Sequence, residues 1–240
     1  TVNVVIFPEA PVLTAPSNTC AAAFALPIVT PVPGFNVQWS IDGDVFTGSP
    51  VLPTTPDCYN IRAQYVLAAD CGATLAGATG TGACGVSNTV NVVIYPQAPT
   101  ISAPANTCNS AFALPVVAAV PSFTVEYSID GGTFAPAPVV PNTAGCHTVA
   151  VRYALTADCG ADPENVIDAG SAGSGACATS NVVSVVIFPA APTLTQPAST
   201  CNAMFILPAV TPVPGFTVEY ELNGSGSWDA NPSTTLAGCY

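Results

Sequence analysis

The chain has 240 residues, of which 50% are hydrophobic and only 7% are charged. Fourteen acidic residues stand against two arginines, Arg62 and Arg152, and no lysine, so the net charge is -12. This balance argues against nucleic acid and against anionic membrane surfaces as partners, because both require clustered Lys and Arg. No apolar stretch reaches the roughly 20 residues of a membrane-spanning helix. The first residues lack the basic region of a signal peptide, so we expect a mature or excised fragment.

The cysteines repeat at fixed intervals along the chain. The first and second cysteines of each sequence copy lie 38 positions apart, the second and third 13, and the fourth lies 24 before the next first cysteine. Only the interval from third to fourth varies, from 13 to 18 positions. We interpret this as a tandem repeat with a five-residue insertion in its second copy. The ten cysteines are Cys20, Cys58, Cys71, Cys84, Cys108, Cys146, Cys159, Cys177, Cys201 and Cys239.

The chain begins with an apolar run, Thr1 to Phe7, that returns as Thr89 to Tyr95 and Val182 to Phe188. Each copy is followed by a Pro-x-Ala-Pro linker, first seen at Pro8 to Pro11. Two prolines restrict the backbone and make a semi-rigid spacer. The predicted boundaries are therefore 1–8, the last strand of a preceding repeat; 9–96, repeat 1; 97–189, repeat 2; and 190–240, an incomplete repeat 3.

Strand signals within each repeat are short and numerous. Residues 23–29 form an apolar run, and residues 35–41, 123–129 and 216–222 alternate between apolar and polar, which indicates a strand with one buried face. An Asp-Gly or Asn-Gly pair ends each of these three strands and predicts a hairpin turn, with a returning strand near residues 44–47. Residues 58–67 alternate again, with Tyr59, Ile61, Ala63 and Tyr65 on one face. Residues 88–95 form the last strand.

Six or seven short strands in about 90 residues, without helix signals, predict an all-β fold of tandem antiparallel β-sandwiches. The aromatic residues Trp39, Tyr127 and Tyr220 in the third strand favour an immunoglobulin-like core. A β-sandwich of different topology is the alternative.

Disulfides are the expected state of the cysteines, in an oxidising, extracellular setting. Zinc is the rival, but zinc sites use closely spaced pairs, and the nearest cysteines here are 13 apart. In such a sandwich the first and second cysteines lie at one pole of the domain, and the third and fourth at the other. Pairing within each repeat then predicts the bonds 20–58, 71–84, 108–146, 159–177 and 201–239.

Catalytic patterns are weak, so we expect no enzyme. The single histidine, His147, takes the position of Tyr59 and Tyr240 and is predicted to pack rather than catalyse. The sequence predicts no catalytic residue, metal site or cofactor; calcium is the low-ranked alternative, with Asp42, Asp44, Asp162, Glu164 and Asp168 as candidate ligands. The loops 72–83 and 160–176, between the third and fourth cysteines, vary most and are candidates for ligand contact, although we favour a role as spacer or buttress.

The run FPEAPVLTAPSNTC, the strand GFNVQWSIDG and the four-cysteine spacing resemble the Ig-like tandem repeats of giant Bacteroidota surface adhesins. The resemblance implies type IX secretion, a cell-surface location and a role as stalk or fibre in adhesion or gliding. Its expected partners are neighbouring repeats of the same chain and other copies in a fibre. Two alternatives stay open: a glycan- or protein-binding module that uses the loop between the third and fourth cysteines, and a filament subunit that exchanges strands.

Overall fold

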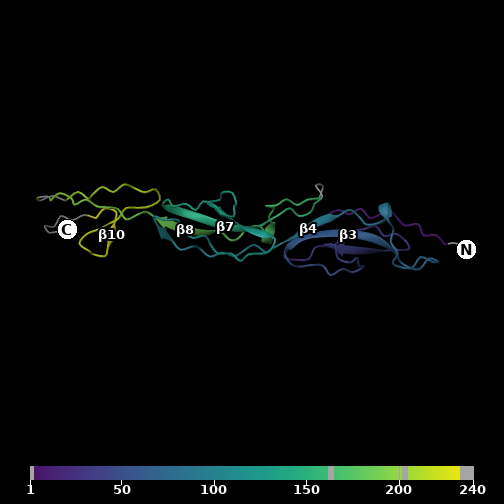
Figure 1. Cartoon of the computed structure of the whole chain (residues 1–240). Helices are drawn as coiled ribbons and strands as arrows, with labels where there is room; N and C mark the ends of the chain where they lie inside the picture. The colour runs from purple at the N-terminus through teal and green to yellow at the C-terminus, as the bar shows by residue number, and fades with distance from the viewer. Residues whose placement is uncertain (1–2, 162–164, 200, 202–204, 233–240) are drawn as a thin grey trace.

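The computed structural model describes residues 3–161, 165–199, 201 and 205–232, and these residues form an all-β structure. Figure 1 shows an extended molecule in which the two sheets follow one another along its length. The helical elements of the described residues are two 3-10 turns, η1 (Gly82–Cys84) and η2 (Gly175–Cys177). No helix in the described part of the chain is long and apolar enough to cross a bilayer.

The first sheet has four strands in the order β1-β4-β3-β2. These are β1 (Thr19–Cys20), β2 (Phe35–Ile41), β3 (Asp57–Leu67) and β4 (Val90–Tyr95). The short strand β1 runs parallel to β4, and the other neighbours are antiparallel.

The second sheet repeats this topology in the order β5-β8-β7-β6. Its strands are β5 (Thr107–Cys108), β6 (Phe123–Ile129), β7 (Gly145–Leu155) and β8 (Val183–Phe188). The pairing register also matches, since Cys20 lies opposite Tyr95 and Cys108 lies opposite Phe188. Beyond it, β9 (Tyr220–Glu221) pairs with β10 (Trp228–Asp229).

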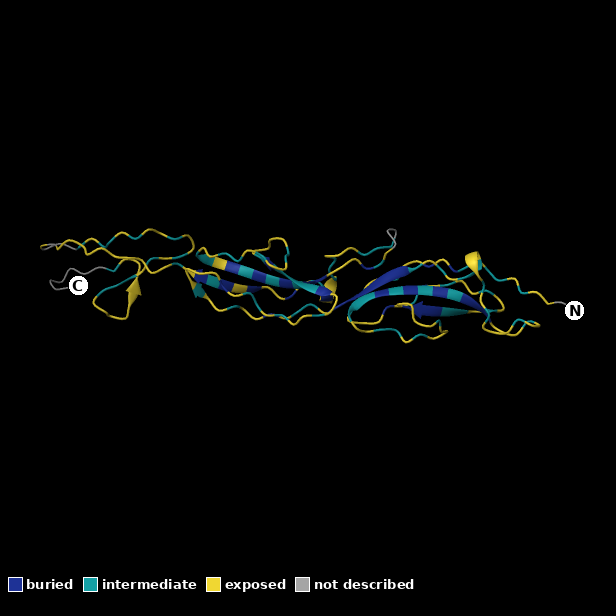
Figure 2. Ribbon diagram, viewed as in Figure 1, coloured by how far each residue is buried: buried dark blue, intermediate teal, exposed yellow. Residues whose placement is uncertain are grey.

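Alternating side chains form the two cores, as the sequence predicts. Tyr59, Ile61, Ala63 and Tyr65 of β3 are buried on one face, and Trp39 lies in the same core. Figure 2 shows buried positions recurring along the strands of both sheets, whereas the C-terminal part is largely exposed. The predicted turns are also confirmed, because Asp42 and Gly43 both have positive φ and the Asp44 N–H donates to the Ile41 carbonyl at 3.0 Å.

The predicted number of strands is wrong. Residues 23–29 bury Phe24 and expose Ile28 to 97%, so they alternate, yet they form no strand ladder. Pro27 lacks the N–H that a ladder requires. The returning strand after Asp44 shrinks to a single bridge between Trp39 and Thr47, and the strand predicted at 216–222 keeps only β9. Extended segments, rather than further hydrogen-bonded strands, cover the remaining core residues of each sheet.

Candidate functional site: the joint between the two sheets

Strand β4 is buried on both faces, and this is where the two sheets meet. Val90, Val92 and Ile94 pack into the core of the first sheet and are 0% exposed. Val93 and Tyr95 point to the other face, where they pack with side chains of the second sheet. We call this contact region the joint; its buried residues are Val93, Tyr95, Phe123, Tyr153, Leu155, Cys159 and Cys177.

Two disulfides cross the joint. Cys20 on β1 is bonded to Cys177 in η2, and Cys58 on β3 is bonded to Cys159, which lies just after β7. The Cα atoms of the bonded residues are 5.7 and 5.6 Å apart, within the usual span of a disulfide. The first and second cysteines of one sequence copy are therefore bonded to the fourth and third cysteines of the next.

The pairing predicted within each repeat is wrong. Cys20 lies on β1 opposite Tyr95, Cys58 lies on β3 opposite Val93, and β4 runs between these strands. Strands two places apart are separated by roughly 9.5 Å, which is too far for a disulfide. The two cysteines do share one pole, as predicted, but the second sheet brings a nearer partner to each of them.

The other predicted pairs fare no better. The bond 159–177 is excluded because both cysteines are bonded across the joint. Cys71, Cys84, Cys108 and Cys146 are unbonded in the described part of the chain, so the pairs 71–84 and 108–146 are not formed. The pair 201–239 includes Cys239, which lies outside the described residues.

Hydrogen bonds add to the disulfides at the joint. The Asn91 Nδ2 donates to the Asn165 carbonyl at 2.8 Å, and the Ala98 N–H donates to the Ala176 carbonyl at 3.0 Å. Asn165 and Ala176 both belong to the loop between the third and fourth cysteines, and Ile167 of this loop packs on the buried residues of the joint. The described part of the loop thus supports the joint.

Two glycines permit this close approach. A Cβ on Gly173 would lie 2.6 Å from the Cys177 Cβ and 3.0 Å from the Tyr95 Cβ. A Cβ on Gly160, whose φ is +104°, would overlap the side-chain amide of Asn91. The backbone of the loop therefore packs directly against β4, which a residue with a side chain would prevent.

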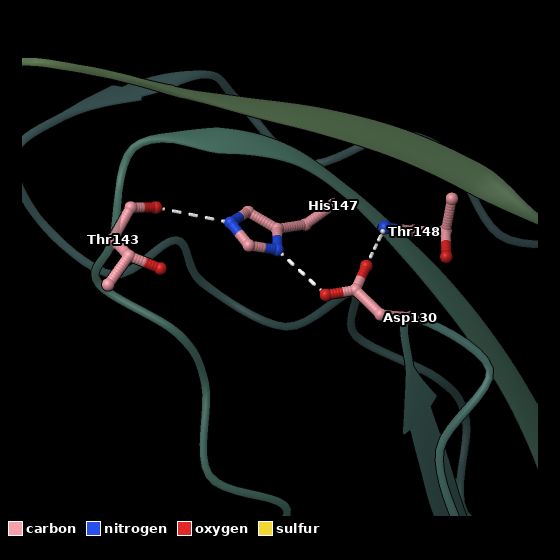
Figure 3. Close-up of polar contacts among 4 residues, drawn as sticks. All are labelled: Asp130, Thr143, His147 and Thr148. Carbon is pink, nitrogen blue, oxygen red and sulfur yellow. Dashed lines mark hydrogen bonds and ion pairs between the residues drawn. The ribbon is translucent and has the colours of Figure 1, made fainter. Parts of the chain in front are cut away.

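His147 lies away from the joint, at the start of β7, and both of its ring nitrogens are bonded (Figure 3). Its Nδ1 is 2.8 Å from Asp130 Oδ2, and its Nε2 is 3.1 Å from the Thr143 carbonyl. Asp130 Oδ1 accepts the Thr148 N–H at 2.8 Å, so the carboxylate closes the hairpin turn onto β7. The hydrogen bonds of His147 thus hold the turn and the start of β7 together, which supports the predicted packing role.

The charges of this pair reinforce each other. The hydrogen bond to Asp130 raises the pKa of His147 above its ordinary value, although burial opposes this. Burial would raise the pKa of the Asp130 carboxyl, but the hydrogen bonds from His147 and Thr148 outweigh it and hold that pKa below its ordinary value. The pair is therefore an imidazolium–carboxylate ion pair over the intervening pH range.

The candidate calcium ligands do not form a site among the residues that the structure describes. Asp42 accepts the Asn60 N–H with its Oδ1, and it takes the same place in its turn as Asp130. Asp44 and Asp168 are exposed, and the described residues contain no group of three acidic, His or Cys side chains suited to a metal. Asp162 and Glu164 lie outside the described residues.

Sequence reasoning expected a linker here and a loop that buttresses it, but it missed the disulfides across the joint and the buried outer face of β4, because it paired the cysteines within each repeat. The signal was present in the run Val90 to Tyr95, in which apolar residues occupy both faces at its end. A strand with one wet face would carry polar residues at Val93 and Tyr95. The second apolar face indicates a further partner, which in the structure is the second sheet.

Comparisons with known proteins give no family. No family model matches the chain, and no curated protein matches it. Among solved structures, a surface glycan-binding protein, SGBP-B of the Bacteroides ovatus mixed-linkage glucan utilization locus, solved with a mixed-linkage heptasaccharide, is similar at a TM-score of 0.24 and 13% identity. The alignment covers 76% of this chain and 46% of that one, so the chain spans about half of its length. What this chain does must be inferred from its own joint.

Proposed function

We propose that the chain is a structural segment of a long extracellular stalk or fibre, with no enzymatic role. The observation that carries this proposal is the pair of disulfides across the joint, Cys20–Cys177 and Cys58–Cys159. One bond would leave the two sheets free to pivot about it. Two bonds on strands either side of β4 oppose rotation as well as separation.

The rest of the joint supports the same role. The buried residues Tyr95 and Phe123, whose ring centroids lie 5.9 Å apart, fill the space between the disulfides. The loop hydrogen bonds of Asn91 and Ala98 then tie the second sheet to β4 and to the linker after it. A module built only to bind a ligand has no need for such a contact between successive sheets.

Disulfides are typical of proteins outside the cytosol, which favours an extracellular location. We further propose that the two sheets are tandem Ig-like repeats, with 9–96 and 97–189 as their bounds. The protein would then be a surface adhesin of the Bacteroidota type, exported by the type IX system and serving adhesion or gliding. The shared strand order of the two sheets supports the repeat, and the sequence resemblance supports the family.

Small-angle X-ray scattering of the chain with intact and with reduced disulfides tests whether the two sheets form a rigid rod. We expect a single elongated particle in the oxidised protein and a broader distribution of shapes after reduction, because two of the constraints at the joint are lost. The circular dichroism spectrum should be the same before and after reduction, which would show that the sheets stay folded and that only the joint has loosened. An oxidised chain as flexible as the reduced one would contradict the proposal, and saturable binding to a glycan array would favour the binding-module alternative.

A further inference from the structure

Cys71, Cys84, Cys108 and Cys146 are unbonded in the described part of the chain, and they occupy the two ends of the pair of sheets. Each has a bonded counterpart at the joint. Cys71 and Cys84 correspond in the sequence copies to Cys159 and Cys177, and Cys108 and Cys146 correspond to Cys20 and Cys58.

At the joint, the second sheet contributes Cys159 and Cys177, and we call this side the receiving half. The first sheet carries an equivalent receiving half with the same local geometry. Cys71 exchanges two backbone hydrogen bonds with Thr74, as Cys159 does with Ile167. Cys84 ends η1, and Cys177 ends η2. Both cysteines are thus held as their bonded counterparts are.

The N-terminal segment already lies on this receiving half. The Ala10 N–H donates to the Ala83 carbonyl at 2.9 Å, the counterpart of the bond between Ala98 and Ala176. The rings of Phe7 and Phe35 are 5.7 Å apart, close to the 5.9 Å of Tyr95 and Phe123. Residues 3–10 therefore contact the first sheet as residues 91–98 contact the second.

That segment also lacks cover on the side away from the first sheet. Val4 and Ile6 are 76% and 87% exposed, whereas their counterparts Val92 and Ile94 are 0% exposed in the core of a sheet. Two large apolar side chains left in water indicate that a further sheet packs around this extended segment.

At the joint, the first sheet contributes Cys20 and Cys58, and we call this side the donating half. The second sheet carries an equivalent donating half. Cys108 lies on β5, parallel to β8, and Cys146 lies on β7, as Cys20 and Cys58 lie on β1 and β3. The outer face of β8 is only partly covered by the described residues: the Phe216 ring lies 6.0 Å from the Phe188 ring, as Phe123 lies near Tyr95. Ser184 and Phe188 remain exposed, whereas their counterparts Asn91 and Tyr95 are buried. This face corresponds to the one that the loop 160–176 covers at the joint.

We propose that both ends are halves of further joints, each closed by two disulfides to an adjoining repeat of the same kind. Cys84 bonds the first cysteine of that repeat and Cys71 its second, while Cys108 bonds a fourth cysteine and Cys146 a third. The adjoining repeat belongs to the same polypeptide, because the ring of Phe216, in the next segment of the chain, lies 6.0 Å from that of Phe188, as Phe123 lies 5.9 Å from Tyr95 at the internal joint. The inference goes beyond the proposed stalk, because it names the covalent partner at each end.

Each bond forms by oxidation of two thiols, which release two protons and two electrons. The oxidant is the disulfide of a thiol–disulfide exchange protein outside the cytosol. One cysteine thiolate attacks that disulfide, and the second thiolate then displaces the oxidant as a dithiol. One complete joint therefore consumes two equivalents of oxidant.

Disulfide mapping of the protein purified from its own cells tests the inference. Free thiols are alkylated first, and the unreduced protein is then cut with pepsin and analysed by mass spectrometry. We expect Cys71 and Cys84 bonded to two cysteines 38 positions apart in one repeat, with Cys84 on the earlier one. Partner peptides with a sequence outside these 240 residues are the expected result. Partner peptides containing Cys108 and Cys146, or Cys201 and Cys239, would identify a second copy and overturn the assignment to the same polypeptide.

Other outcomes overturn the inference. Bonds 71–84 or 108–146, alkylated thiols at all four positions, or a partner without the repeat spacing would each do so. A Cys71→Ser variant provides a check: we expect one newly alkylated thiol on the predicted partner, with the bonds Cys20–Cys177 and Cys58–Cys159 unchanged. The bonds at the internal joint can be present while those at the ends are absent, so this inference can fail without the failure of the rod.

Discussion

His147 shows how one residue can alter a contact that both sheets share without changing the fold. Its counterpart Tyr59 donates a hydrogen bond to the Thr55 carbonyl at 2.9 Å, and His147 Nε2 lies 3.1 Å from the corresponding Thr143 carbonyl. The histidine adds what tyrosine lacks, a second nitrogen that bonds Asp130. The second sheet thereby gains an ion pair that depends on pH.

We expect this ion pair to stabilise the chain most between roughly pH 3.8 and 6.5, the ordinary pKa values of the two groups. The raised pKa of His147 means that its contribution is fully present below pH 6.5 and is lost as the pH rises through the raised value. The lowered pKa of Asp130 means that its contribution is present above pH 3.8 and is lost as the pH falls through the lowered value. Urea unfolding at pH 5 and pH 8 measures the difference.

The matched variant is His147→Tyr, which restores the residue of the sister copy and keeps a donor for the Thr143 carbonyl. We expect the free energy of unfolding of the native chain to fall from pH 5 to pH 8 relative to that of the variant. Equal pH dependence of the two proteins would show that His147 does not carry a stabilising charge.

At the scale of the element, the two faces of β4 pack in different places. Val92 packs in the core of the first sheet and Val93 packs at the joint, and both are 0% exposed. Burial alone gives the two valines the same cost of truncation. Because the two side chains pack in different clusters, truncation of each should loosen a different part of the structure.

We expect Val92→Ala and Val93→Ala each to lower the stability of the packing around them by roughly 1–3 kcal/mol, from lost transfer free energy and a small cavity. Hydrogen exchange should separate them: Val92→Ala should speed exchange in β2 and β3, and Val93→Ala in η2 and the loop before it. The two variants act as controls for each other. Identical exchange profiles would mean that the sheets and the joint open as one unit.

Much of the sheet around β4 could be predicted from the sequence, and the apolar outer face of β4 indicates that it has a partner, but the cysteines that bond across this contact could not be predicted. Alternation over residues 35–41 and 58–67 predicts β2 and β3, because a two-residue period in burial is a local property of the chain. The strand predicted at 23–29 fails because Pro27 removes a ladder donor, which a pattern of apolar residues does not register. The disulfide partners depend on which poles meet, and the cysteine intervals are compatible with pairing inside or between repeats.

At the scale of the whole molecule, the disulfides determine the path along which a pulling force travels. A force applied at the chain ends reaches Cys20 and passes directly to Cys177, since the bond joins residues 157 positions apart. The segment between them, which includes β2 to β7, lies outside this path, whereas β8 follows Cys177 and stays within it. Across the joint, the chain would therefore resist extension through covalent bonds rather than through hydrogen-bonded strands.

Single-molecule pulling from the two chain termini measures this effect. Reduction of both disulfides should lengthen the fully extended chain by about 530 Å, because a residue spans at most about 3.3–3.6 Å and 157 positions become available. A Cys20→Ser, Cys177→Ser chain in its oxidised form should be about 190 Å longer at full extension than the oxidised native chain, because Cys58–Cys159 still shields 101 of the 157 positions. A Cys58→Ser, Cys159→Ser chain separates this pairing from pairing within each repeat. It should gain no length when oxidised, because its missing bond lies inside the segment that Cys20–Cys177 shields, whereas pairing within each repeat would release about 190 Å in the same variant.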